Sequence, residues 1–125
     1  MSKPPASPAE LKTMLHRVPL LADLPDALLS RLAEGARQRD IARGEVLVTE
    51  GEAAETLYFI LSGRFVVRTE GKPIAELAAG DPIGEIAFFA GGTRSATVSA
   101  MRASQVLELG RKEYAALSRD MPELS

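Results

Sequence analysis

The stretch GDPIGEIAFFAGGTRSATV, residues 80–98, determines how the rest of the chain is interpreted. It opens on a glycine and Pro82, which suit a tight turn because glycine accepts positive φ and proline lacks an N–H group. The apolar run Ile86–Phe89 follows, and two glycines end it before it can extend into a long helix. Residues 95–100 then alternate between polar and apolar side chains, which is typical of a strand. The stretch therefore predicts a turn, one short helical segment and a strand.

Two charged side chains flank the helical segment, Glu85 before it and Arg94 after it. The start of such a segment leaves backbone N–H groups unpaired, and these groups favour an anion. The planar guanidinium of Arg94 suits a phosphate in particular. Since Glu85 cannot bind the same anion, its carboxylate is expected to accept a hydrogen bond from a hydroxyl group. The predicted ligand carries one phosphate and a neighbouring sugar hydroxyl.

The same stretch resembles the phosphate-binding cassette of cyclic-nucleotide-binding domains, the family of cyclic AMP receptor proteins and protein kinase A regulatory subunits. That cassette runs Phe-Gly-Glu-Leu/Ile-Ala-Leu, a short spacer, and then Pro-Arg-Ala/Ser-Ala-Thr-Val. Here residues 83–88 are IGEIAF and residues 93–98 are TRSATV, so that Ile83 replaces an aromatic residue and Thr93 replaces a proline. The resemblance extends from about residue 20 to about residue 124.

The resemblance implies a role for the residues of the cassette. Glu85 would bind the ribose 2′-hydroxyl, and Arg94 would bind the cyclic phosphate. The backbone N–H groups of Ala87 and Ala96 and the hydroxyl of Ser95 would complete the phosphate site. The complete set of predicted ligand-binding residues is Gly84, Glu85, Ile86, Ala87, Arg94, Ser95, Ala96, Val67, Ile74 and Ile83, with Val67, Ile74 and Ile83 as apolar walls for the purine.

The chain as a whole predicts an α+β domain: an antiparallel β jelly roll of about eight strands, flanked by N-terminal helices and one short C-terminal helix. Ser7–Glu10 has the serine, proline and glutamate of a helix start, and residues 28–36 carry a second apolar stripe. The hydrophobic period then becomes two, with the first strand at residues 45–50 and glycine at almost every later corner. Arg111–Arg119 predicts the last amphipathic helix.

Composition indicates an ordinary soluble domain, with 125 residues, 46% hydrophobic and 26% charged. We expect a tail and helix over residues 1–19 and the ligand-binding domain over residues 20–125. The sequence has no cysteine, no apolar run long enough to span a membrane and no visible signal peptide, so a cytoplasmic location is expected. A net charge of −2 gives no general attraction to nucleic acid or to anionic lipid.

Catalysis is not expected from this sequence. Ser95 has no neighbouring histidine or lysine to activate it, and Glu85 would be held ionised by its partner Arg94. No acidic or histidine residues have metal-ligand spacing, so neither a metal nor a cofactor is predicted. His16, the single histidine, is expected on a helix surface, which leaves a metal-binding jelly roll without ligands. The arginines between residues 31 and 43 are interpreted as a solvated face rather than a nucleic-acid patch.

Two alternatives stand beside a cyclic AMP sensor: a cyclic GMP sensor, and a jelly-roll interaction domain with an unoccupied pocket. Cyclic AMP is favoured because similar sites that prefer cyclic GMP carry threonine where Ser95 stands. With no helix-turn-helix, kinase or channel segment in the sequence, we expect a regulatory module that serves a larger effector. The helix that closes over the base in the family is expected to be truncated here. Cyclic AMP and cyclic GMP should therefore differ by less than about tenfold in affinity.

Overall fold

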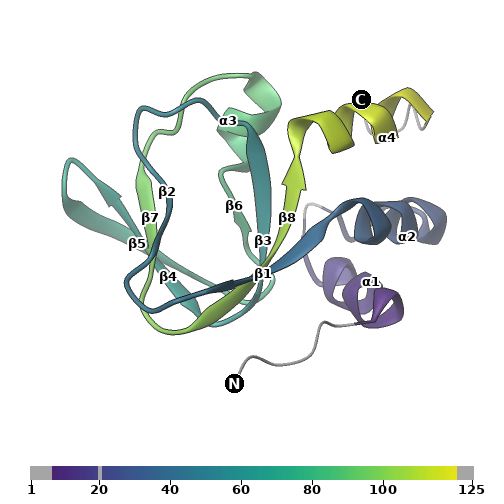
Figure 1. The fold of residues 1–125 in the computed structure, drawn as a ribbon, viewed down its shortest axis with the longest axis horizontal. Helices are drawn as coiled ribbons and strands as arrows, with labels where there is room; N and C mark the ends of the chain where they lie inside the picture. The colour runs from purple at the N-terminus through teal and green to yellow at the C-terminus, as the bar shows by residue number, and fades with distance from the viewer. Residues whose placement is uncertain (1–6, 20, 121–125) are drawn as a thin grey trace.

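The computed structural model describes residues 7–19 and 21–120, which form helices at both ends of the chain and strands between them (Figure 1). The helices are α1 (Pro8–His16), α2 (Asp26–Gly35), α3 (Glu85–Ala90) and α4 (Arg111–Asp120). The strands are β1 (Arg37–Ile41), β2 (Val46–Val48), β3 (Thr56–Ser62), β4 (Arg64–Thr69), β5 (Lys72–Ala78), β6 (Pro82–Ile83), β7 (Thr97–Ala100) and β8 (Ser104–Gly110). The predicted α+β class is confirmed.

The strands form two four-stranded sheets, in the orders β1-β8-β3-β6 and β2-β7-β4-β5, and every pair is antiparallel. The chain passes repeatedly from one sheet to the other, which is the connectivity of the predicted jelly roll. One such corner is Gly63, at φ +100°, where a Cβ would lie 1.9 Å from Ser104 Oγ. In Figure 1, α1, α2 and α4 lie together on one side of the strands, and α3 lies at the end of the barrel.

Strand β3 supplies two separate apolar cores. Phe59 packs toward the helices, in one cluster with Leu15 and Leu29, whereas Ile60 packs between the sheets with Phe65. Alternate side chains of a strand point to opposite faces, so one continuous apolar run is buried on both sides. The helices thus cover the outside of the barrel, and the cluster that contains Ile60 and Phe65 fills part of its interior.

Helix α1 begins where the sequence predicts, and α2 carries the second predicted apolar stripe. The N-terminus of α1 is a capping box, in which Ser7 Oγ accepts from the Glu10 N–H and Glu10 Oε1 accepts from the Ser7 N–H. Asp26, the first residue of α2, ties the two helices together through Lys12 Nζ at 3.1 Å and His16 Nε2 at 2.9 Å. His16 is exposed, as expected, and the predicted domain boundary at residue 19 remains a prediction.

The first strand begins earlier than the sequence indicated. Arg37 and Arg39, expected on a solvated face, lie in the edge strand β1, which pairs with β8. Both arginines donate to the carboxylate of Glu108, at 3.0 and 3.1 Å. The strand shows no hydrophobic period, because its two arginines are paired with a carboxylate of the neighbouring strand.

Candidate functional site

The predicted helical segment is α3, a helix of six residues whose two ends are set by glycines. Gly84 precedes it at φ +75° and Gly91 follows it at φ +71°, both in the left-handed region that glycine adopts without steric penalty. The N–H groups of Glu85, Ile86 and Ala87 belong to the first turn and have no acceptor within the helix. These groups therefore form an electropositive start to α3.

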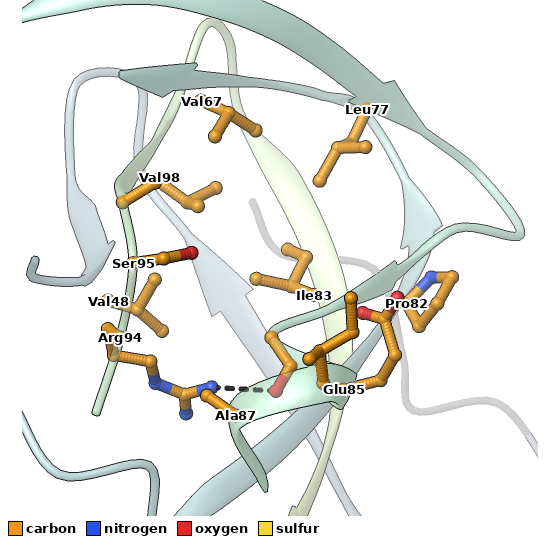
Figure 2. A pocket seen from close by; sticks show the side chains of 13 residues that line it. Val48, Val67, Leu77, Pro82, Ile83, Glu85, Ala87, Arg94, Ser95 and Val98 are labelled. Atoms are coloured by element: carbon orange, nitrogen blue, oxygen red, sulfur yellow. Dashed lines mark hydrogen bonds between the residues drawn. The ribbon is translucent and has the colours of Figure 1, made fainter. Parts of the chain in front are cut away.

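Arg94 lies beneath this helix and is buried, with 6% of its surface exposed. Its Nη1 donates to the Gly84 carbonyl at 3.1 Å (Figure 2). Its Nη2 donates to the Thr56 carbonyl. Burial is the main cause that lowers the pKa of Arg94 from its usual value. A guanidinium has five N–H donors, and the bonds to these two carbonyls use only two of them. The side chain is thus fixed in place without being saturated.

The backbone of Arg94 is held as firmly as its side chain. Its N–H donates to the Glu52 carbonyl at 2.8 Å, and its carbonyl accepts from the Gly51 N–H at 2.9 Å. The next residue, Ser95, accepts at its carbonyl from Thr69 Oγ1 at 3.4 Å, while its own side chain is exposed. These bonds anchor the cassette between the turn at residue 51 and the hairpin of β4 and β5.

The expected ion pair between Glu85 and Arg94 is not formed. Within residues 7–19 and 21–120, the side chain of Glu85 makes no hydrogen bond or ion pair with another residue, and Arg94 donates to backbone carbonyls instead. Figure 2 shows the two charged groups well apart, with the Glu85 carboxylate on the side of Pro82 and the Arg94 guanidinium on the side of Ala87. The carboxylate is available for another partner.

A cavity of about 210 Å³ lies between α3 and the strands. Every predicted ligand-binding residue lines it except Ile74. Four further residues line the cavity that were not among the predicted ligand-binding residues: Val48, Leu77, Pro82 and Val98. Val98 could have been found, because it lies two residues beyond Ala96 on the same face of the alternating run. Val48 could not, since its strand is brought to the site by pairing between distant residues, Val48 with Val98.

Ile74 lies outside the cavity, with 63% of its surface exposed. The register of β4 against β5 shifts at this point: Val67 pairs with Ala75 and Arg68 with Pro73, so Ile74 has no partner across the ladder. Leu77 lines the cavity in its place. The two side chains are three residues apart in one strand, so they point to opposite faces.

The described part of the chain shows no feature of a metal centre or of a membrane span. No group of histidine and acidic side chains among residues 7–19 and 21–120 could hold a metal ion. No helix in those ranges is long and apolar enough to cross a membrane.

The two sheets and the cavity beside α3 define a β jelly-roll domain with one candidate ligand site among the described residues. The family model described as "Cyclic nucleotide-binding domain" matches residues 38–120, and the chain belongs to that family. This confirms the resemblance found in the sequence. The family is regulatory and non-catalytic, and its members homologous to this chain include kinase regulatory subunits and gated channels.

Individual relatives agree with this assignment. The chain is 37% identical over 123 residues to an uncharacterized NTE family protein of Mycobacterium tuberculosis, across 98% of this chain and 21% of the relative. It is 37% identical over 112 residues to a cyclic nucleotide-gated potassium channel of Rhizobium etli, across 90% of this chain and 31% of the channel. The chain therefore spans between about a fifth and a third of these relatives.

A solved structure shows the same fold. The regulatory domain of Toxoplasma gondii protein kinase A, determined in complex with cyclic AMP, superposes with a TM-score of 0.83 at 26% identity. The match covers 95% of this chain and 47% of that one.

Proposed function

We propose that this chain binds cyclic AMP in the cavity at the start of α3 and serves as the regulatory module of a larger effector. In this site Arg94 and the first-turn N–H groups of α3 bind the cyclic phosphate. Glu85 accepts a hydrogen bond from the ribose 2′-hydroxyl, and Ser95 and Ala96 complete the phosphate site.

The observation that carries this proposal is the separation of the two charged groups around one cavity. Arg94 has donors beyond those that bond Gly84 and Thr56, whereas Glu85 has no partner among the described residues. A cyclic nucleotide presents an anion and a hydroxyl on adjacent parts of one rigid ring system, so it can engage both groups at once. A bound phosphate also offsets the cost of keeping the Arg94 charge buried.

The remaining lining accounts for the base. Apart from Glu85, Arg94 and Ser95, the described lining residues are glycine or apolar, as the face of a purine requires. The cavity of about 210 Å³ is smaller than the roughly 300–1,000 Å³ of typical small-molecule sites. The phosphate and ribose are therefore enclosed while part of the base extends toward solvent.

Relatives support the ligand and the regulatory role. The Toxoplasma regulatory domain was crystallised with cyclic AMP, and the Rhizobium relative is named as a channel gated by cyclic nucleotides. The Rhizobium channel is longer than the region that this chain matches, which agrees with a module that acts on an attached effector.

Isothermal titration calorimetry tests the proposal. Cyclic AMP should bind with one site per chain, and 5′-AMP, which has the same base and ribose but an open phosphate with a second charge, should bind at least about tenfold more weakly. Equal affinity for the two would contradict the cyclic-phosphate assignment. Binding of cyclic GMP alone would support the cyclic GMP alternative, and no binding of any of the three would support an unoccupied interaction domain.

A further inference from the structure

Arg111, the first residue of α4, makes an unusual set of contacts with the far end of α3. Its Nη2 donates to the Phe88 carbonyl at 2.7 Å and also to the Ala54 carbonyl. Its guanidinium carbon lies 4.5 Å from the centre of the Phe88 ring, within range of a cation–π interaction. The Arg111 N–H donates to the Glu55 carbonyl at 3.0 Å, which fixes the start of α4 to the same loop.

These contacts mirror those of Arg94. Arg94 joins the Gly84 carbonyl, at the start of α3, to the Thr56 carbonyl. Arg111 joins the Phe88 carbonyl, in the last turn of α3, to the Ala54 carbonyl, two residues before Thr56. Two arginines thus tie the two ends of one short helix to one stretch of chain, residues 54–56.

The position of α3 depends on such ties. A helix of six residues is too short to be stable by its own hydrogen bonds, so tertiary contacts determine where it lies. A cation at the carbonyl end of a helix is favourable, and only arginine can donate to two carbonyls while its plane covers an aromatic ring. Arg111 does not line the cavity itself.

We propose that Arg111 is a positioning residue for the anion site: it holds α3 in the place where the first-turn N–H groups and Arg94 converge on one phosphate. This inference rests on the proposed function, because it concerns the same site. Arg111 acts through Phe88 and the helix, not through contact with the ligand. Arg94 and Arg111 both carry a positive charge and both bond carbonyls of residues 54–56, so their guanidiniums repel each other. A bound anion reduces this repulsion.

The test uses Arg111→Lys and Arg111→Met, with Glu55→Gln as the matched control. Lysine keeps the charge, but it is shorter and lacks the planar guanidinium that covers the Phe88 ring, so both Arg111 variants should bind cyclic AMP about tenfold more weakly. Glu55→Gln removes the ion pair of 3.6 Å with Arg111 Nε and leaves the carbonyl bonds, so its affinity should stay within about twofold. The Tyr114 ring, 5.5 Å from that of Phe88, still packs α4 against α3 in each variant.

Two readouts separate positioning from a general loss of stability. The first is unfolding measured without ligand: a reversibly unfolded fraction also lowers the apparent affinity, so a displaced α3 is shown by weaker binding in a variant that is fully folded at the binding temperature. The second is a double-mutant comparison. In an Arg94→Ala background, Arg111→Met should reduce the affinity for cyclic AMP by a smaller factor, since one of the groups that Arg111 positions is gone. An equal reduction in affinity in the wild-type and Arg94→Ala backgrounds would overturn the inference, and so would wild-type affinity in Arg111→Lys.

The two proposals fail in different ways. Wild-type protein that binds no cyclic AMP contradicts the proposed function and this inference with it. Wild-type protein that binds cyclic AMP while both Arg111 variants bind equally well contradicts the inference alone.

Discussion

The guanidinium of Arg94 lies where a side chain at position 84 would have to be. A Cβ on Gly84 would come within 1.9 Å of Arg94 Nη1, the same atom that donates to the Gly84 carbonyl at 3.1 Å. Gly84 also has φ +75°, which disfavours any residue with a Cβ. The glycine before α3 is therefore required by the arginine ten positions later, and the spacing of the cassette reflects a direct contact.

Replacing Gly84→Ala should weaken cyclic AMP binding by at least about tenfold, because the methyl group displaces the Arg94 guanidinium. Gly44→Ala is the matched control: Gly44 has φ +85°, but a Cβ there would meet no atom within 4 Å. Both variants should lose about 1–2 kcal/mol of unfolding free energy from backbone strain, measured by chemical denaturation. A Gly84→Ala protein that binds as well as Gly44→Ala would contradict the contact between Gly84 and Arg94 as the cause.

Glu85→Ala should weaken cyclic AMP binding about ten- to a hundredfold, the value of a lost hydrogen bond to a charged group of roughly 1.5–3 kcal/mol. The free energy of unfolding without ligand should change little, since Glu85 has no partner within the described ranges. Glu34→Ala, on the exposed face of α2, makes the same change in charge away from the cavity. It should leave the affinity unchanged, and a loss equal to that of Glu85→Ala would point to net charge instead.

Arg94→Ala should cost more affinity than Glu85→Ala, because the bound phosphate loses its cationic partner. It should also lower the stability of the ligand-free protein, since the Gly84 and Thr56 carbonyls lose their donors at about 1–3 kcal/mol for each group left unpaired. Removal of a buried charge offsets part of this cost. Thermal unfolding without ligand is the measurement, and unchanged stability would show that the two carbonyls find other donors.

The sequence predicts the local part of the site well and the non-local part poorly. Gly84, Glu85 and Arg94 lie within one segment, so the sequence alone places them around one helical turn. Thr56, the second acceptor of Arg94, is 38 positions away. No local pattern places it there, and for this reason the sequence alone favours the nearby Glu85 as the partner of Arg94.

Two further errors have the same origin. In β1, Arg37 and Arg39 pair with Glu108, 71 and 69 positions away, so a hydrophobic period does not reveal the pairing of this strand. In β5 both Ile74 and Leu77 are apolar, and alternation allows only one of them to face inward. The register shift against β4 decides between them, and register is a property of two strands rather than one.

Stability should also depend on pH through the pair of helices at the N-terminus. Hydrogen bonds from His16 and then from Lys12 lower the pKa of Asp26 from its ordinary value. A carboxyl group with a lower pKa in the folded state stabilises the fold above its unfolded pKa, and this contribution is lost as the pH falls through the folded pKa. Asp26→Asn should therefore be less stable than wild type at neutral pH, with the difference disappearing in acid.

Denaturant unfolding at neutral and acidic pH measures this difference, which should be small and sensitive to salt because the group is exposed. Asp23→Asn is the control, an exposed carboxylate before α2 that has no ion pair within the part of the chain that is described. A difference between Asp26→Asn and wild type that stays constant from neutral to acidic pH would exclude ionisation of Asp26 as its source.

The last prediction concerns the choice between bases. The polar side chains that line the described cavity are Glu85, assigned to the ribose, and Arg94 and Ser95, assigned to the phosphate; of these, the Ser95 hydroxyl is the group that can also meet the base. One rotatable hydroxyl on an exposed residue discriminates weakly, so cyclic AMP and cyclic GMP should differ by less than about tenfold in affinity, or roughly 1.4 kcal/mol. Ser95→Thr keeps the hydroxyl but restricts its χ1, and should shift the ratio severalfold toward cyclic GMP. Ser95→Ala should shift the ratio the other way. Calorimetry of both nucleotides with the three proteins measures the ratio, and a thousandfold preference in the wild type would mean that groups beyond this lining close over the base.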